Sequence, residues 1–244
     1  MSRPALPFVP ALLGLLCALP AVPAGAVHPG PSQSTRLDVG SFTISVGGQR
    51  AGREQFSVQR VESNDGGTIE VRSESAVGDT RTAVRLEADS AGTPVRYSIE
   101  ARRGTEQILR LGGQRVRGRF ATLARSVTGE AAREYLLRPG AVVVEDDGIV
   151  QYALLVRGRT LAEGEGLTLP SLTPVANSQG VVRVVLEAAH DVVIIAGARR
   201  DARRYRIVTD AGEVRVLWAE ADGALLRLRI PARGLDALRD DVPR

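Results

Sequence analysis

Apolar and polar side chains alternate one by one over most of this chain, and this alternation constrains its fold more than any other feature. In residues 41–46, Phe42 and Ile44 stand between hydroxyl side chains, and the same alternation recurs in residues 84–88 and 95–101. Because successive side chains of a β-strand point to opposite faces, a period of two predicts strands with one apolar face and one polar face. This pattern is typical of an antiparallel sheet that is buried on one side.

Short glycine-rich turns, such as Gly47-Gly48 and residues 64–67, separate the alternating runs and accept the backbone angles of tight hairpins. A sheet of about ten such strands must curl on itself or cover another element. Residues 149–156 have helical spacing instead and predict a short helix packed against the apolar face. We therefore predict a mainly β fold, a large curved antiparallel sheet (half-barrel or open barrel) wrapped around a short helix and a crossover segment.

The chain divides into a leader, a tether and one folded domain. Residues 27–36 are rich in Pro, Gly and Ser and predict a disordered tether. Residues 37–244 predict a single β-rich domain, with sub-sheets at about 37–145 and 176–232 that the helix and crossover of residues 146–175 join.

Four segments of the domain carry further expectations. The strand pattern weakens over residues 112–140, although residues 117–121 and 134–137 remain compatible with strands. Residues 159–180 predict an extended crossover, and residues 234–239 predict one helical turn. The β-branched runs 181–186 and 192–195 predict two buried strands, with His190 in the turn between them.

Residues 1–26 have the pattern of a secretory signal peptide. Arg3 precedes a short apolar run that ends at Ala24-Gly25-Ala26, a small-x-small cleavage pattern. The run is too short and too interrupted by proline to span a bilayer, so we expect an exported protein, periplasmic or secreted, with no transmembrane segment in the mature chain. Cys17, the single cysteine, lies in this leader; a lipid anchor on it is the less favoured alternative, because Leu16 rather than a small residue precedes it.

The chain contains no lysine, and its 32 arginines give it a formal net charge of +4. A positive surface attracts polyanions such as nucleic acid or anionic lipid headgroups. An evenly mixed, exposed charge is the favoured interpretation, because acidic residues accompany most arginines. Aromatic residues make up 4% of the chain and do not interleave with arginines, so the stacking platform for single-stranded nucleic acid is missing. We predict no nucleic-acid partner.

Catalytic and metal-binding patterns are sparse. The two histidines are His28, in the tether, and His190, where His190-Asp191 is either half of a hydrolase dyad or a polar turn. The turn is favoured, because no Gly-x-Ser-x-Gly nucleophile motif is present. The chain lacks the paired cysteines or histidines of a zinc site, and Asp146-Asp147-Gly148 lacks the ligand spacing of a calcium loop. We predict a protein that is not an enzyme, with no catalytic residues, metal or cofactor.

Four aromatic residues, Phe42, Tyr97, Tyr152 and Trp218, are the candidate ligand-binding residues. Curved sheets often enclose a cavity, and these side chains have the character of its lining. The alternative, that they are simply part of the core, is favoured on the residues alone.

Two stretches of the chain resemble uncharacterised exported bacterial β-proteins known only as domains of unknown function. One comprises residues 40–48 and 52–56, and the other residues 202–207, 216–218 and 222–231. At greater distance, such folds are similar to the curved sheets of periplasmic lipoprotein carriers. The resemblance implies a fold and implies no catalytic residue.

These expectations leave two hypotheses for function. The first is a non-catalytic envelope protein that binds a lipid-like or polypeptide partner on the concave face of its sheet. The alternative is a structural or scaffolding module that docks another envelope protein through its Arg/Glu face or a strand edge, and a hydrolase is a distant third. A cavity of several hundred Å³, roughly the size of a small-molecule site, would favour the first hypothesis. A filled core would favour the alternative.

Overall fold

A computed structural model describes residues 34–62 and 67–243 of the chain. The expected signal peptide and residues 27–33 of the expected tether lie outside the described residues. The first strand begins at Ser34, so residues 34–36, the end of the expected tether, belong to the sheet.

Strands form almost all of the described part of the chain. Its elements, in order, are β1 (Ser34–Val46), β2 (Gln49–Val61), β3 (Thr68–Val77), β4 (Thr80–Asp89), β5 (Pro94–Arg103), β6 (Glu106–Val116), β7 (Arg119–Ser126), β8 (Gly129–Leu136), β9 (Val142–Val143), the 3₁₀ helix η1 (Val150–Leu155), β10 (Gly166–Thr173), β11 (Ser178–Ile195), β12 (Ala198–Thr209), β13 (Val214–Ala219), β14 (Leu225–Ile230), the 3₁₀ helix η2 (Pro231–Arg233) and β15 (Leu235–Arg239).

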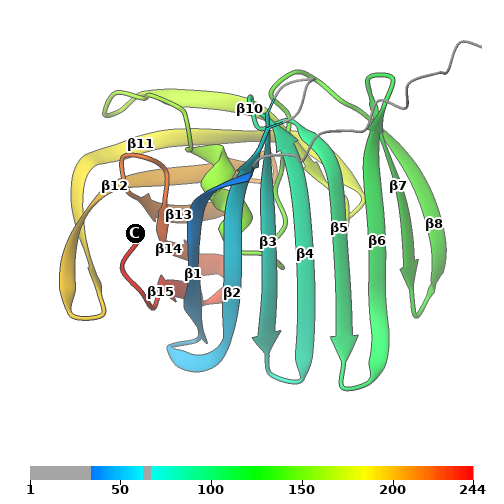
Figure 1. Ribbon diagram of the computed structural model, residues 1–244, viewed down its shortest axis with the longest axis horizontal. Coiled ribbons are helices and arrows are strands. Elements are labelled where there is room, and N and C mark those ends of the chain that lie inside the picture. Colours follow the sequence, from blue (N-terminus) through cyan, green and yellow to red (C-terminus); the bar gives the residue numbers. More distant parts are fainter. Residues whose placement is uncertain (1–33, 63–66, 244) are drawn as a thin grey trace, which may run out of the picture. The chain divides into compact units, whose positions relative to one another are not determined.

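All fifteen strands of the described residues belong to one sheet. Two series of antiparallel strands run outward from its middle, β1 to β8 in one direction and β15 back to β10 in the other, where β9 adds a short parallel edge. They meet where β1 pairs antiparallel with β15, with Phe42 opposite Arg239. The sheet folds over so that β1–β8 lie in front of β10–β15 in Figure 1, and η1 lies between the two halves. η1 contacts β3 on one half and β14 on the other.

Side chains join the β8 edge of the sheet to the hairpin between β10 and β11. Tyr135 Oη on β8 donates a hydrogen bond to Asn177 Oδ1 (3.1 Å), and Gln179 Nε2 donates to the carbonyl of Leu136 (2.6 Å). β9 covers only two residues of β10, in the single parallel pairing of the described strands. The sheet is therefore an open barrel, and the predicted fold class, a curved β-sheet around a short helix, is confirmed.

The two halves of the sheet share one apolar core. It includes Phe56 and Ile99 from the front half and Leu186 and Leu228 from the back half, all buried. All six residues of η1 are buried within it. The helical spacing of residues 149–156 thus identified the segment that fills the interior. This segment forms a 3₁₀ helix that is buried on all sides rather than along one apolar stripe.

Two local expectations were wrong. The expected crossover contains β10, and residues 235–239 form β15 rather than a helical turn. The weak region 112–140 contains the end of β6 and all of β7 and β8, and its strand-compatible residues 117–121 and 134–137 overlap β7 and β8. In each case pairing with a neighbouring strand supplies the backbone hydrogen bonds, so a weak or helix-like pattern is overridden by its tertiary context.

β11 is a single strand where two were expected, and His190 lies within it rather than in a turn. The register of β11 with β12 shifts between Leu186 and Ala188 and again before Asp191. Such irregularities reverse which residues face inward. Val184 and Leu186 therefore lie in the main core, whereas Val193 and Ile195 pack with Leu226 in a second, separate cluster.

Candidate functional site

Three of the four candidate aromatic residues come together inside the sheet. Phe42, Tyr97 and Tyr152 are each at most 2% exposed and belong to the main core, where the ring of Phe42 stacks on that of Phe56. Trp218 lies apart, against the second cluster. Its Nε1 donates a hydrogen bond to Asp191 Oδ2 (3.0 Å), and the guanidinium of Arg227 lies 5.3 Å from the centre of its ring.

A buried carboxylate holds the start of the internal helix. Glu54, on β2, points inward with no exposed surface, and its two oxygens accept hydrogen bonds from the backbone N–H groups of Ile149 (2.8 Å) and Val150 (2.9 Å). Burial raises the pKa of Glu54 to about 7, although these hydrogen bonds and one from Ser73 act in the opposite direction. Glu54 therefore satisfies the free N–H groups at the start of η1, which have no partner within a helix.

The segment just before η1 is held by two more acids. Asp146 accepts hydrogen bonds from Tyr152 Oη (2.6 Å) and from Arg215 Nε and Nη2 (both 3.1 Å), and Arg233 lies 3.1 Å away. Burial by itself raises the pKa of Asp146, but the hydrogen bonds from Arg215 and Tyr152 outweigh it and keep the pKa below its ordinary value. Burial raises the pKa of Glu145 to about 8. The interior is therefore closed by the chain's own segment, anchored at several points.

Small polar hollows remain at the end of the sheet near these acids. One, of about 270 Å³, is lined by Glu54, Asp147 and Arg233 among others. Within residues 34–62 and 67–243, no group of three or more acidic, His or Cys side chains is arranged to hold a metal ion.

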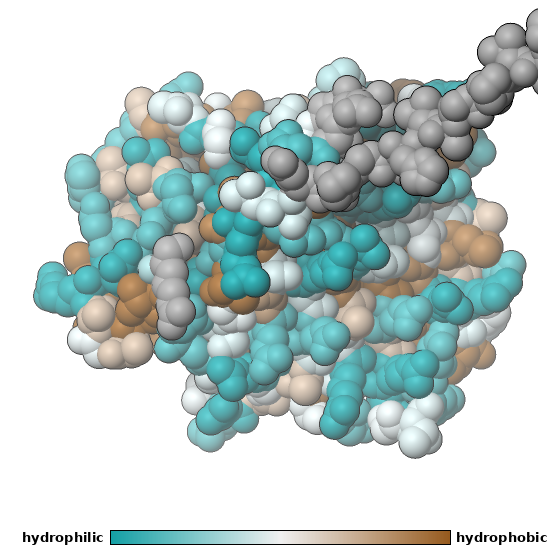
Figure 2. All heavy atoms as spheres, in the orientation of Figure 1, coloured by the Kyte–Doolittle hydropathy of each residue, from teal (hydrophilic) through white to brown (hydrophobic). Residues whose placement is uncertain are grey.

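Three further hollows lie on the other face of the sheet. On β2, the inward Glu54, Phe56 and Val58 alternate with the outward Arg53 and Gln55, and the outward residues line these hollows. Three hollows of about 680, 540 and 380 Å³ adjoin one another, since the first shares Arg85 and Ser98 with the second and Glu74 with the third. We call this surface, over β1–β7, the outer-face trough. Figure 2 shows mainly hydrophilic side chains over this face, with paler and apolar patches between them.

Arginines form the walls of the outer-face trough. Its charged lining residues are Arg53, Arg72, Arg81, Arg85, Arg96, Arg102, Glu74 and Glu100. The floor contains small residues, among them Ser57, Ala83, Ser98 and Gly112. A β-carbon added to Gly112 meets no atom within 4 Å, so the surface above it is open.

Most of the wall arginines are already paired. Glu70 lies 2.9 Å from Arg72 and 2.5 Å from Arg85, and Arg53 lies 3.1 Å from Asp240. These partly exposed pairs fix the arginine side chains at small energetic benefit. The trough thus presents ordered guanidinium groups and hydroxyls above a floor that an extended chain can approach closely.

His190, on β11, lies at the surface. His190 Nδ1 lies 3.5 Å from Asp201 Oδ2 rather than from Asp191, and both side chains are at least three-quarters exposed. Among the described residues, no helix is long and apolar enough to cross a membrane.

Comparison with known proteins supports the fold and gives no information on activity. No family model matches the sequence, and neither does any curated protein. A crystal structure of a β-barrel-like protein of domain of unknown function DUF1849 from Brucella abortus is similar, with 12% identity over 85% of this chain and 97% of that chain and a TM-score of 0.53. A DUF1089 family protein from Pseudomonas aeruginosa has 12% identity over 85% of this chain and 95% of that chain, with a TM-score of 0.42. The first likeness confirms the curved β fold.

Proposed function

We propose that the protein is a non-catalytic binding module that docks a polypeptide partner in the outer-face trough. The observation that carries the proposal is the continuity of three hollows over β1–β7, with ordered arginines on the walls and small residues on the floor. A trough of this kind suits an extended chain, because the partner's backbone can approach Ser98 and Gly112 closely while its polar groups meet guanidinium and hydroxyl donors.

The filled interior supports this choice over the concave face. η1 and the aromatic side chains of the core occupy the space in which a lipid-like ligand would have to lie. A lipid-like ligand stays a prediction of the sequence. Export to the periplasm or the medium, which the pattern of residues 1–26 favours, is part of the proposal and would make an envelope protein the natural class of partner.

Site-specific photo-crosslinking in the cells that make the protein tests the proposal. A benzophenone amino acid replaces Ser98 in the trough or, as a matched control, Arg199 on β12 of the other half of the sheet. We expect one dominant protein adduct from position 98 and no such adduct from position 199. The partner identified in the adduct should bind the purified protein, and Gly112→Trp, which fills the open space above the floor, should weaken that binding by about tenfold or more.

Two results would reject the proposal. One is the same set of adducts from both positions, which indicates random contact. The other is a partner whose binding is unchanged by Gly112→Trp in a protein that remains folded, which would place the docking surface elsewhere.

A further inference from the structure

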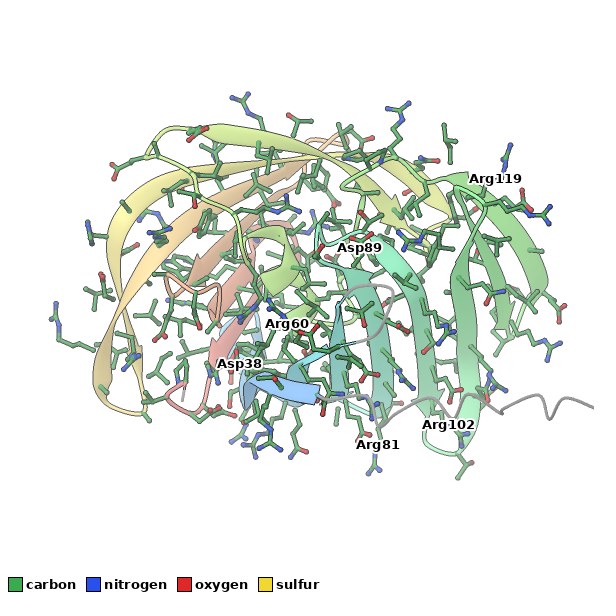
Figure 3. All side chains as sticks on the ribbon, turned by 45° about the horizontal axis from the view of Figure 1, so that its top comes forward. Asp38, Arg60, Arg81, Asp89, Arg102 and Arg119 are labelled. Atoms are coloured by element: carbon green, nitrogen blue, oxygen red, sulfur yellow. The ribbon has the colours of Figure 1, made fainter. Side chains whose placement is uncertain are left out.

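Arg81 on β4 and Arg102 on β5 stand directly opposite one another on the outer face. Both side chains are exposed and line the outer-face trough, and Figure 3 shows them near each other at the same end of their strands. The other arginines of these two strands, Arg85, Arg96 and Arg103, each have a carboxylate within 4.0 Å. Within the described residues, Arg81 and Arg102 form no such ion pair.

Like charges directly opposite in a sheet destabilise it, so an uncompensated pair is a cost to the fold. The neighbouring strands place no acid opposite Arg81 to reduce this repulsion. On β3, Ala76 lies opposite Arg81, and on β2, Arg53 lies opposite Ala76. Two carboxylates line the same hollow, but Glu100 lies 3.2 Å from Arg110, and Glu74 forms no ion pair within 4.0 Å with Arg81 or Arg102. A group from outside the chain that carries negative charge would remove the repulsion.

We propose that Arg81 and Arg102 together bind an acidic side chain of the polypeptide that occupies the outer-face trough. The inference rests on the proposed function and names the chemistry of the partner. Two guanidinium groups match the two oxygens of a carboxylate through paired N–H donors. The hollow beside them, about 380 Å³, admits a side chain rather than a folded domain. The charged lining of the trough, six arginines and two glutamates, favours the approach of an acidic partner.

Binding of fluorescein-labelled hexaglutamate to the purified full chain, followed by fluorescence anisotropy, tests the inference. We compare the unmodified protein with Arg102→Glu and with Arg199→Glu, which makes the same change in net charge on β12. We expect saturable binding that Arg102→Glu weakens at least about tenfold and that Arg199→Glu changes less than about twofold. The melting temperature of Arg102→Glu should not fall, because the substitution replaces a repulsive cross-strand pair by an attractive one.

Equal weakening by both substitutions would overturn the inference, since it would show attraction to net charge alone. Absence of saturable binding would overturn it as well. Competition by inorganic phosphate as effective as that by unlabelled hexaglutamate would show a simple anion site and would reject the polypeptide. If the unmodified protein does not bind hexaglutamate, and the protein adduct at position 98 still forms in Arg102→Glu, this inference is rejected and the proposed function stands.

Discussion

Glu54 is the residue that couples the sheet to the segment inside it. Both of its oxygens accept backbone hydrogen bonds from the start of η1, in a place that water does not reach. Replacing it with alanine leaves two buried N–H groups without acceptors, each of which costs about 1–3 kcal/mol. We expect Glu54→Ala to lower the free energy of unfolding by about 2–4 kcal/mol in urea denaturation, and Glu54→Gln, which keeps one oxygen, to lower it less.

An outward glutamate serves as the control. Glu74, on β3, is exposed, so Glu74→Ala should change the free energy of unfolding by no more than about 0.5 kcal/mol. Equal losses for Glu54→Ala and Glu74→Ala would show that the hydrogen bonds to η1 do not hold it in place.

The sequence contains one signal for this residue. Glu54 falls on the same parity as the apolar Phe56 and Val58, so the alternation itself places a carboxylate on the inward face. Its partners, the N–H groups of η1, lie about a hundred residues further along the chain, and no local pattern indicates them. The buried pair of Arg239 with Asp38 shares this property, because it joins the first strand to the last.

Two glycines of this sheet differ in how closely other atoms approach the position of a β-carbon. A β-carbon on Gly52 of β2 would lie 2.0 Å from the carbonyl oxygen of Ala76, whereas one on Gly112 of β6 would meet nothing within 4 Å. We therefore expect opposite effects of two identical substitutions on the midpoint of urea unfolding. Gly52→Ala should destabilise by about 1–3 kcal/mol through overpacking, and Gly112→Ala should stabilise by about 0.5–1 kcal/mol by restricting the unfolded chain. Similar effects at both positions would contradict the close approach of β2 and β3.

A strand shows clear alternation only where one of its faces stays buried along its length. β4 and β5 meet this condition. The alternating run 95–101 nearly covers β5, whereas the run 84–88 covers only the second half of β4. β11 does not, because its two register shifts turn its end away from the main core. β8 is exposed on both faces except at Tyr135, so it offers almost no alternation to detect.

For the whole molecule, the buried acids make stability depend on pH. The pKa of Glu54 rises from 4.5 to about 7 and that of Glu145 from 4.5 to about 8, so the folded protein keeps protons that the unfolded chain has released. Stability should therefore fall as pH rises from 4.5 through 7 to 8, by at most about 1.4 kcal/mol per pH unit for each group. The pKa of Asp146 is lowered, so its protonation changes the stability only at pH values below this window.

Urea unfolding at several pH values between about 5 and 8 measures this slope. Glu54→Gln should flatten the part between about pH 5 and 7, because it removes one of the two groups that titrate there. A stability that rises with pH over this window would show that the hydrogen bonds to the two carboxylates outweigh their burial.

At this scale the curved sheet and the helix that fills it were predictable, because one apolar face on so many strands requires both. The pairing of β1 with β15 was not, since it joins segments about two hundred residues apart. The outer-face trough was also not predictable, because outward residues follow the same polar pattern whether the surface above them is flat or hollowed.

We propose that the chain fills its own interior and binds its partner on the outer face. Titration of the folded protein with the uncharged fluorescent dye N-phenyl-1-naphthylamine tests this claim most directly, since the dye reports an accessible apolar cavity. We expect no saturable rise in fluorescence. Stoichiometric binding of one dye per chain, displaced by a fatty acid or a phospholipid, would show an open lipid-binding interior and contradict the account.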